Sequence, residues 1–256
     1  MQHATSRLFV GLAMAVLVSA SATSSRSEET TIAVAANFTS AAKRLGAAFE
    51  ASSGHRVVFS FGSTGQLYTQ IAHGAPFDAF LAADEARPER AIADGLGVKG
   101  SRFTYATGVL VLWSADPDRI DGTPAVLSDP TLRHVGIANP ATAPYGAAAI
   151  QTMKALGVLE GLESRLVEGK SVTQTYQFVA TRNAPVGFIA ASQVKVGDTG
   201  SHWTVPEDMY RPLRQDAVLL ERGRDNEAAK AFLEFLKSAE AVKMIEELGY
   251  RAPRDD

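Results

Sequence analysis

Cysteine is absent from this chain of 256 residues. Its absence excludes disulfide bonds, thiol catalysis, thiolate metal sites and a lipid anchor on an N-terminal cysteine. The chain also lacks an excess of one charge: 25 basic and 28 acidic residues give a formal net charge of −3, and the basic residues form no block. A basic block is what would attract nucleic acid. We therefore expect no nucleic-acid partner.

Long apolar runs are also missing, apart from one at the N-terminus. Arg7 precedes an apolar run from Leu8 to Val18, and the small residues Ser19 to Thr23 follow it. A basic start, an apolar stretch of this length and a small-residue end are the three parts of a secretory signal peptide. The run is too short to span a bilayer permanently. We predict that residues 1–22 are removed on export to the periplasm, leaving a mature protein that is a monomer with a net charge of −4.

Groups with obvious catalytic or metal-binding spacing are scarce. The mature histidines have no i,i+4 pair and no H-E-x-x-H motif, so we interpret them as surface or packing residues rather than metal ligands: His55, His73, His134 and His202. Asp78 and Asp84 flank a strand-like segment; they could form a catalytic pair, but roles as loop caps are favoured. Ser63 lacks the G-x-S-x-G context of a nucleophile. We predict that the protein is not an enzyme and needs no cofactor.

The chain alternates short strand-like segments with longer helical patterns. Helical spacing is clear in Phe38–Phe49, in Ile150–Leu156 and in two segments near the C-terminus. The strand-like segments are rich in Val, Ile and Phe: Thr31–Ala35, Arg56–Phe61, Phe77–Ala82, Val109–Trp113, Val135–Ala138, Val186–Ala190 and Ala217–Leu220. This alternation predicts an α/β fold whose parallel sheets are covered by helices on both faces. Ligands of such sheets bind outside the carboxyl ends of the strands.

Four turns at those ends share one composition. Each brings small or hydroxyl-bearing residues to the start of a helical pattern, where unpaired N–H groups and a partial positive charge suit an anion. The same residue types are also ordinary helix caps, so a single turn would say little. The turns are Ala35–Ser40, Phe61–Gln66, Asn139–Gly146 and Glu168–Thr173. Two lie in each half of the chain, which favours an anion site between the halves.

Three stretches carry a resemblance to a known family: VAANFTSAAKRLGAAFE, FSFGSTGQLYTQIAHGAPFDAFLAAD and GIANPATAPYGAAAIQTMKALG. They resemble the periplasmic molybdate-binding proteins of ABC transporters, and the likeness runs through the whole mature chain. It implies a two-lobed periplasmic-binding-protein fold of type II, with a ligand cleft between the lobes and two crossover strands. The crossovers would lie near Tyr105–Val111 and Gln215–Val218. Residues 30–106 plus 217–256 would form lobe 1, and residues 107–216 would form lobe 2.

The resemblance also implies which residues hold the oxyanion, without any charged side chain. The matching positions are Asn37, Ser63, Thr64, Tyr145 and Val172. Some members of the family have a tyrosine hydroxyl at the position of Ala190, which this chain lacks. We expect Tyr145 to supply that donor; the alternative is that its ring lines the rim of the cleft and its backbone N–H makes the contact.

The chemistry of the ion agrees with neutral donors. Molybdate and tungstate are fully deprotonated at neutral pH and need donors only, whereas a phosphate site must also accept a proton. The first three turns hold no acidic residue, and Glu168 in the fourth is expected outside the pocket. Discrimination against sulfate, which has the same charge, must come from cavity size.

We therefore expect a solute-binding protein that delivers molybdate or tungstate to an ABC-transporter permease in the inner membrane. The alternatives are a binding protein for sulfate, phosphate, a ferric ion or an organic anion, an exported hydrolase, and a cytoplasmic regulator. The signal peptide argues against the regulator. The hydrolase would need a general base near a nucleophile, or a metal cluster.

Overall fold

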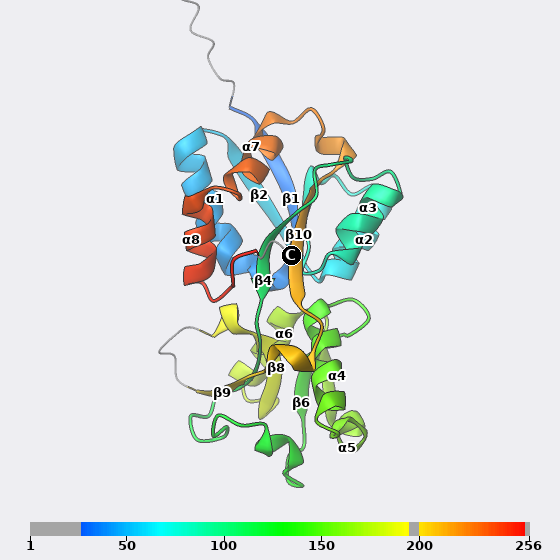
Figure 1. Cartoon of the computed structure of the whole chain (residues 1–256), viewed down its shortest axis with the longest axis vertical. Coiled ribbons are helices and arrows are strands. Elements are labelled where there is room, and N and C mark those ends of the chain that lie inside the picture. Colours follow the sequence, from blue (N-terminus) through cyan, green and yellow to red (C-terminus); the bar gives the residue numbers. More distant parts are fainter. Residues whose placement is uncertain (1–26, 195–199, 254–256) are drawn as a thin grey trace, which may run out of the picture.

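The computed structural model describes residues 27–194 and 200–253, so the predicted signal peptide lies outside the described residues. The chain forms two α/β lobes, one above the other in Figure 1, and it passes between them twice. This architecture confirms the predicted two-lobed fold. No helix of the described residues combines the length and apolar character needed to cross a bilayer.

The first lobe is built on a sheet with the strand order β2-β1-β3-β10-β4. Apolar clusters cover both of its faces: α1, α7 and α8 pack with one cluster, and α2 and α3 lie at the other. The strands are β1 (Glu29–Ala35), β2 (Arg56–Gly62), β3 (Ala79–Leu81), β4 (Phe103–Gly108) and β10 (Leu213–Leu219). The helices are α1 (Thr39–Ser53), α2 (Thr64–Ala72), α3 (Ala86–Ala93), α7 (Glu227–Phe235) and α8 (Ala239–Glu247).

The second lobe repeats the plan with the strand order β7-β6-β8-β5-β9. Its core is one continuous apolar cluster around Phe188 and Trp113. The strands are β5 (Leu110–Ser114), β6 (Val135–Ala138), β7 (Leu166–Gly169), β8 (Val186–Ala190) and β9 (Ser201–Thr204). The helices are α4 (Pro144–Ala155), α5 (Leu159–Leu162) and α6 (Val172–Ala180).

Helix ends follow the local signals in the sequence. The helix α1 buries Ala41, Leu45 and Phe49 on one face and stops at Gly54, whose φ of 73° is left-handed. Glycine adopts that conformation without the penalty that a Cβ brings, so it ends helices readily. Gly157, with a φ of 71°, ends the turn after α4 in the same way.

The sheets are mixed rather than purely parallel. Strand β1 pairs in parallel with β2 and β3, but β10 runs antiparallel to both β3 and β4. In the second lobe β5 is likewise antiparallel to β8 and β9. The expectation of parallel sheets was therefore wrong for the strands next to the crossings, because these reach their partners through lobe-to-lobe connections and not through strand-helix-strand units.

The chain crosses between the lobes twice. It leaves the first sheet at the end of β4, at Gly108, and enters the second at Leu110. It returns through residues 205–212 into β10, whose first residue, Leu213, pairs with Gly108. The predicted second crossing, Gln215–Val218, already pairs with β3 and β4 in the first sheet. The domain limits themselves, 30–106 plus 217–256 and 107–216, remain a prediction.

Phe232 tests the core of the first lobe. It is 0% exposed, and its ring centroid lies 5.3 Å from that of Phe49 and 5.7 Å from that of Phe59. We expect Phe232→Ala to lower the free energy of unfolding by about 3–5 kcal/mol, since it leaves a cavity in a packed cluster. Urea denaturation measures the loss. The control is Val58→Ala, because Val58 is 36% exposed and should cost little. Equal losses for the two variants would contradict the assignment of the core.

Candidate functional site

A small cavity lies between the lobes, where residues of all four predicted turns meet. The space between its lining atoms, open solvent included, is only about 200 Å³. None of its ten lining residues carries a charged side chain: Ala35, Ala36, Asn37, Ser63, Thr64, Ala83, Ala143, Pro144, Tyr145 and Val172. The structure therefore brings together all five positions that the resemblance implied, and Glu168 is exposed and not among the lining residues.

Strand register explains why the turns meet. Ala35 at the end of β1 pairs in parallel with Gly62 at the end of β2, and Ala138 pairs with Gly169 in the other lobe. Parallel neighbours end at the same edge of a sheet, so the turns that follow them are adjacent. Each lobe thus presents two turns to the cavity.

Three helices begin at this cavity. The first residues of α2, α4 and α6 are Thr64, Pro144 and Val172. The first N–H groups of an α-helix have no acceptor within the helix, and the helix dipole makes that end partially positive. Proline has no N–H, so Tyr145 carries the first one in α4. The cavity therefore combines donors and positive potential without a cation.

Ser63 and Ser171 show the two possible uses of a turn hydroxyl. Ser171 is an ordinary N-cap, since its side chain accepts a hydrogen bond of 3.3 Å from the N–H of Gln174. Ser63 stands at the same position before α2, but its side chain makes no cap bond. It is 3% exposed, and within the described part of the chain its Oγ has no hydrogen-bond partner. A buried hydroxyl without a partner is costly, so this one is available for a ligand.

The side chains of Thr64 and Asn37 are bound by the protein itself. Thr64 Oγ1 accepts a bond of 3.0 Å from the N–H of Ala83, which leaves the hydroxyl hydrogen to donate. Asn37 Nδ2 donates to Gln215 Oε1 at 2.9 Å and to the Tyr250 hydroxyl at 3.2 Å. Both amide hydrogens of Asn37 are therefore committed, and its backbone N–H is the donor left for a ligand.

Tyr145 is buried, and its hydroxyl lies beside Gly108 and Gln215, where the chain passes between the lobes. The Tyr145 oxygen accepts a bond of 3.3 Å from Gln215 Nε2. Burial raises the pKa of Tyr145 well above its ordinary value, so the hydroxyl stays protonated and can donate. Ala190 is also buried, but it pairs with Leu110 and does not line the cavity.

The lobes touch each other beside the cavity. The N–H of Gly65 donates to the Thr142 carbonyl at 2.8 Å, and Thr173 Oγ1 donates to the Ala36 carbonyl at 3.0 Å. A Cβ on Gly65 would lie 3.0 Å from the Thr142 Cα and 3.1 Å from its carbonyl oxygen. The two lobes therefore stand in a closed arrangement that leaves almost no room at Gly65.

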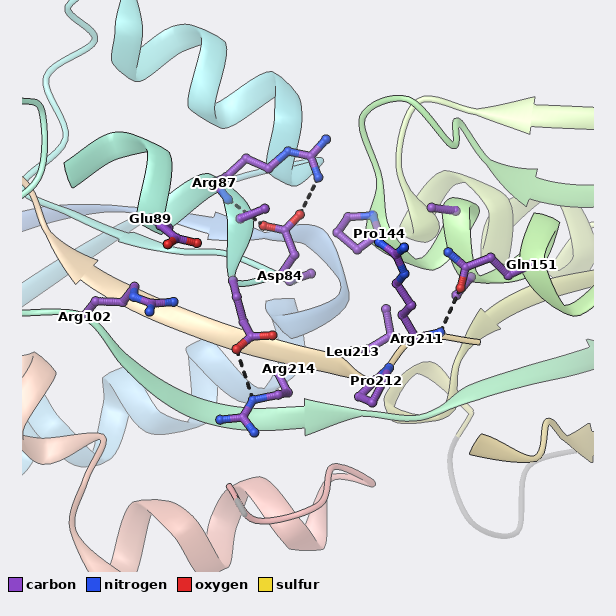
Figure 2. Close-up of a pocket in the computed structure, with 15 residues that line it drawn as sticks. Asp84, Arg87, Glu89, Arg102, Pro144, Gln151, Arg211, Pro212, Leu213 and Arg214 are labelled. Carbon is purple, nitrogen blue, oxygen red and sulfur yellow. Dashed lines mark hydrogen bonds and ion pairs between the residues drawn. The ribbon is translucent and has the colours of Figure 1, made fainter. Parts of the chain in front are cut away.

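A larger open groove adjoins the cavity on one side. It shares Ala83 and Pro144 with the cavity and has an empty volume of about 1260 Å³ (Figure 2). Arg87 pairs with Asp84 and donates to the Ala141 carbonyl of the other lobe at 3.1 Å. Arg214 pairs with Glu85 at 3.2 Å.

The carboxylates that could have formed a catalytic pair are engaged in the scaffold. Asp78 Oδ2 accepts bonds from the Thr31 N–H at 2.9 Å and from Thr30 Oγ1 at 3.2 Å. Asp84 Oδ1 accepts from the N–H of Arg87 at 3.1 Å before α3. These capping contacts agree with the interpretation favoured from the sequence.

Sequence reasoning missed the residues behind the cavity, chiefly Gln215 and Tyr250. Gln215 is fully buried, and the Tyr250 hydroxyl donates to the Asn37 carbonyl at 2.7 Å. The available signal was the polar pair Gln215-Asp216 at the start of a strand-like run, since polar residues in a buried strand need partners.

The family model described as bacterial extracellular solute-binding protein matches residues 30–251. The chain belongs to this family. Among solute-binding proteins, it is 57% identical to the molybdate-binding protein ModA of Rhodobacter capsulatus over 222 residues, 87% of this chain and 88% of that protein. It is 50% identical to ModA of Azotobacter vinelandii, covering 98% of this chain and 99% of the relative.

Solved structures agree with this assignment. The periplasmic molybdate-binding protein of Azotobacter vinelandii superposes with a TM-score of 0.85 at 39% identity, covering 88% of this solute-binding protein and all of that chain. The sulfate-binding protein SubI of Mycobacterium tuberculosis has a TM-score of 0.73 at 16% identity over 88% of this chain and 87% of its own, and it shows the shared fold alone. The resemblance predicted from the sequence is confirmed.

The stability of the ligand-free protein should depend on the hydroxyl of Thr64, which has a partner, and not on that of Ser63, which has none among the described residues. We expect Ser63→Ala to leave the free energy of unfolding unchanged or to raise it by up to about 1 kcal/mol, because it removes an unsatisfied buried hydroxyl. Thr64→Val should lower it by about 1–3 kcal/mol, because the buried N–H of Ala83 loses its acceptor. Urea denaturation without ligand compares the variants. A marked destabilisation by Ser63→Ala would show that its hydroxyl has a structural partner.

Proposed function

We propose that this solute-binding protein captures molybdate, or tungstate, in the periplasm and delivers it to the permease of an ABC transporter. The support is twofold. Relatives at 57% and 50% identity over nearly their whole length are molybdate-binding proteins. The cavity between the lobes is lined by neutral residues from four strand-to-helix turns, two from each lobe.

The donor set that we propose contains Asn37, Ser63, Thr64, Tyr145 and Val172. Asn37 and Val172 would donate their backbone N–H groups, and Ser63, Thr64 and Tyr145 would donate their hydroxyl hydrogens. A fully deprotonated dianion accepts hydrogen bonds at every oxygen and donates none, so donors alone satisfy it. Charge-assisted hydrogen bonds of this kind are shorter and stronger than neutral ones.

An exported hydrolase lacks support in this cavity. Its ten lining residues include hydroxyls but no histidine, carboxylate or lysine that could act as a general base. A nucleophilic hydroxyl needs such a base within hydrogen-bond reach. We therefore propose binding and release without chemical change of the ion.

The lobe arrangement suits capture by closure. We propose that the lobe built on the first sheet and the lobe built on the second move as two bodies about the paired ends of β4 and β10. The sequence limits 30–106 plus 217–256 and 107–216 are proposed for these lobes except that residues 213–216, which pair with β4, go with the first. Hinge closure around a ligand is the usual behaviour of such proteins. The bonds from Gly65 to Thr142 and from Thr173 to Ala36 would form only when the lobes meet.

Titration calorimetry with four sodium salts tests the ligand. We expect molybdate and tungstate to bind tightly and competitively, and sulfate to bind more weakly by several orders of magnitude. Rigid donors lose good geometry around a smaller ion, whereas the charges of sulfate and molybdate are equal. Phosphate should also bind weakly, because none of the lining residues carries a carboxylate that would accept a hydrogen bond from the P–OH group of its monoanion. Sulfate or phosphate binding as tightly as molybdate would refute the proposal.

Tyr145→Phe tests the hydroxyl donor while keeping the ring. Losing one hydrogen bond to a charged ligand should cost about 1.5–3 kcal/mol, or about ten- to a hundredfold in molybdate affinity. Unchanged affinity would show that only the backbone of Tyr145 contacts the ion. The double variant Tyr145→Phe with Ala190→Tyr asks whether the two positions are exchangeable. Partial recovery of affinity supports the exchange, and no recovery argues against it.

A further inference from the structure

Gln215 lies behind the cavity and reaches residues of both lobes. It is 0% exposed and belongs to β10, just after the chain returns from the second lobe. The register of β10 against β4 shifts between Gln215 and Asp216. An irregularity of this kind in a strand pair redirects a side chain, and such bulges occur beside functional sites.

Both ends of the Gln215 amide are used. Oε1 accepts a bond of 2.9 Å from Asn37 Nδ2 and lies 3.1 Å from the Tyr105 hydroxyl, both in the first lobe. Nε2 donates to the Tyr145 hydroxyl of the second lobe at 3.3 Å. The opposite orientation of the amide would place Nε2 against Asn37 Nδ2, where two donors face each other.

The direction of these bonds decides where the hydrogen of Tyr145 points. An amide nitrogen only donates, so Tyr145 is the acceptor in its contact with Gln215. A tyrosine hydroxyl has one hydrogen, which must then turn toward a different acceptor. The cavity that Tyr145 lines is where a bound oxyanion would offer one.

Gly108 makes the contact between Gln215 and Tyr145 possible. A Cβ at this position would lie 2.1 Å from the Tyr145 hydroxyl oxygen and 2.7 Å from Gln215 Nε2. Both distances are far inside van der Waals contact, and the neighbours are a buried ring and a buried amide. The bare backbone at the end of β4 is therefore part of the arrangement.

We propose that Gln215 is a positioning residue of the oxyanion site: its amide orients the hydroxyl hydrogen of Tyr145, in the second lobe, toward the ligand and fixes the side chain of Asn37 in the first lobe. The inference rests on the proposed function. It adds that the donor in the second lobe is set by a residue of the first, so that the site is complete only in the closed arrangement.

A double-mutant cycle with sodium molybdate tests this dependence. Gln215→Met removes both amide bonds while keeping a long side chain, and we expect it to lower the molybdate affinity about tenfold. In the Tyr145→Phe background the same change should cost much less, because the hydroxyl that it positions is gone. Losses that multiply in the double variant, or unchanged affinity of Gln215→Met, would overturn the proposal.

Gln215→Glu, made alone and in the Tyr145→Phe background, provides a second test. An ionised carboxylate repels the dianion in both backgrounds, so only the part of the pH dependence that Tyr145→Phe removes reports on the hydroxyl. An ionised carboxylate accepts the Tyr145 hydrogen and withholds it from the ion, whereas the protonated acid can donate as the amide does. Affinity should therefore fall as the pH rises through the pKa of this buried glutamate. The titratable groups around it are Tyr105, Tyr145 and Tyr250, whose pKa values burial raises, and Asp216, which pairs with Arg102 at 2.8 Å. The parent should show no such pH dependence, and a profile for Gln215→Glu that Tyr145→Phe leaves unchanged would contradict the proposal.

The matched control is Gln151→Met. Gln151 lines the open groove, where its Oε1 accepts a bond of 2.8 Å from the Arg211 N–H, as Figure 2 shows. It does not line the cavity, so we expect its loss to leave molybdate affinity unchanged. Failure of the proposed function would appear as a parent that does not bind molybdate, whereas failure of this inference leaves the parent's binding intact.

Discussion

The antiparallel pair of β4 and β10 connects the two lobes. Gly108 ends β4 and Leu213 begins β10, and these two residues pair at the point where both connections leave the first sheet. Contacts across the cavity depend on this pair, because both connections to the second lobe start from it. The buried carboxylate on it has partners: Asp216 accepts from Arg102 and from Thr104 Oγ1 at 2.7 Å. Since a buried carboxylate without partners would be very costly, these bonds keep the strand pair in register.

Hydrogen bonds across the lobes end mainly on backbone atoms. The acceptors include the carbonyls of Ala36, Ala141 and Thr142. The carbonyl of Asn37 also accepts a bond of 3.3 Å from Ser192 Oγ. Main-chain acceptors do not ionise and are held by secondary structure, so these bonds are less sensitive to ionic strength than salt bridges are. Inside the cavity, too, no charged side chain among the lining residues takes part: the N-termini of α2, α4 and α6 supply the positive potential that cationic side chains would otherwise supply. A dianion held in this way has no counter-charge to be separated from when the lobes open.

The sequence predicted the strands that are apolar and missed those that are not. Val135–Ala138 and Val186–Ala190 have the predicted limits. Strand β4 was missed because FTYATG is half polar, and β7 and β9 because each has only four residues, of which at least two are polar or glycine. The first residues of β10 were missed for a different reason: Gln215 and Asp216 are buried only because partners far away in the sequence satisfy them. The cavity-lining positions could be predicted because they follow strand ends, whereas the polar network behind them depends on tertiary contacts that no local pattern encodes.

The place of β10 in the first sheet also sets an order of folding. It lies between β3 and β4, so β4 has no partner in that sheet until residues 213–219 have been made. All five strands of the second lobe precede β10 in the chain, which means that this lobe can complete its own sheet first. The first lobe, although it contains the N-terminal strand, is then the last to close, through pairings between residues that are distant in sequence. Pairings of this kind form slowly, so the edge of β3 stays exposed for longest during folding.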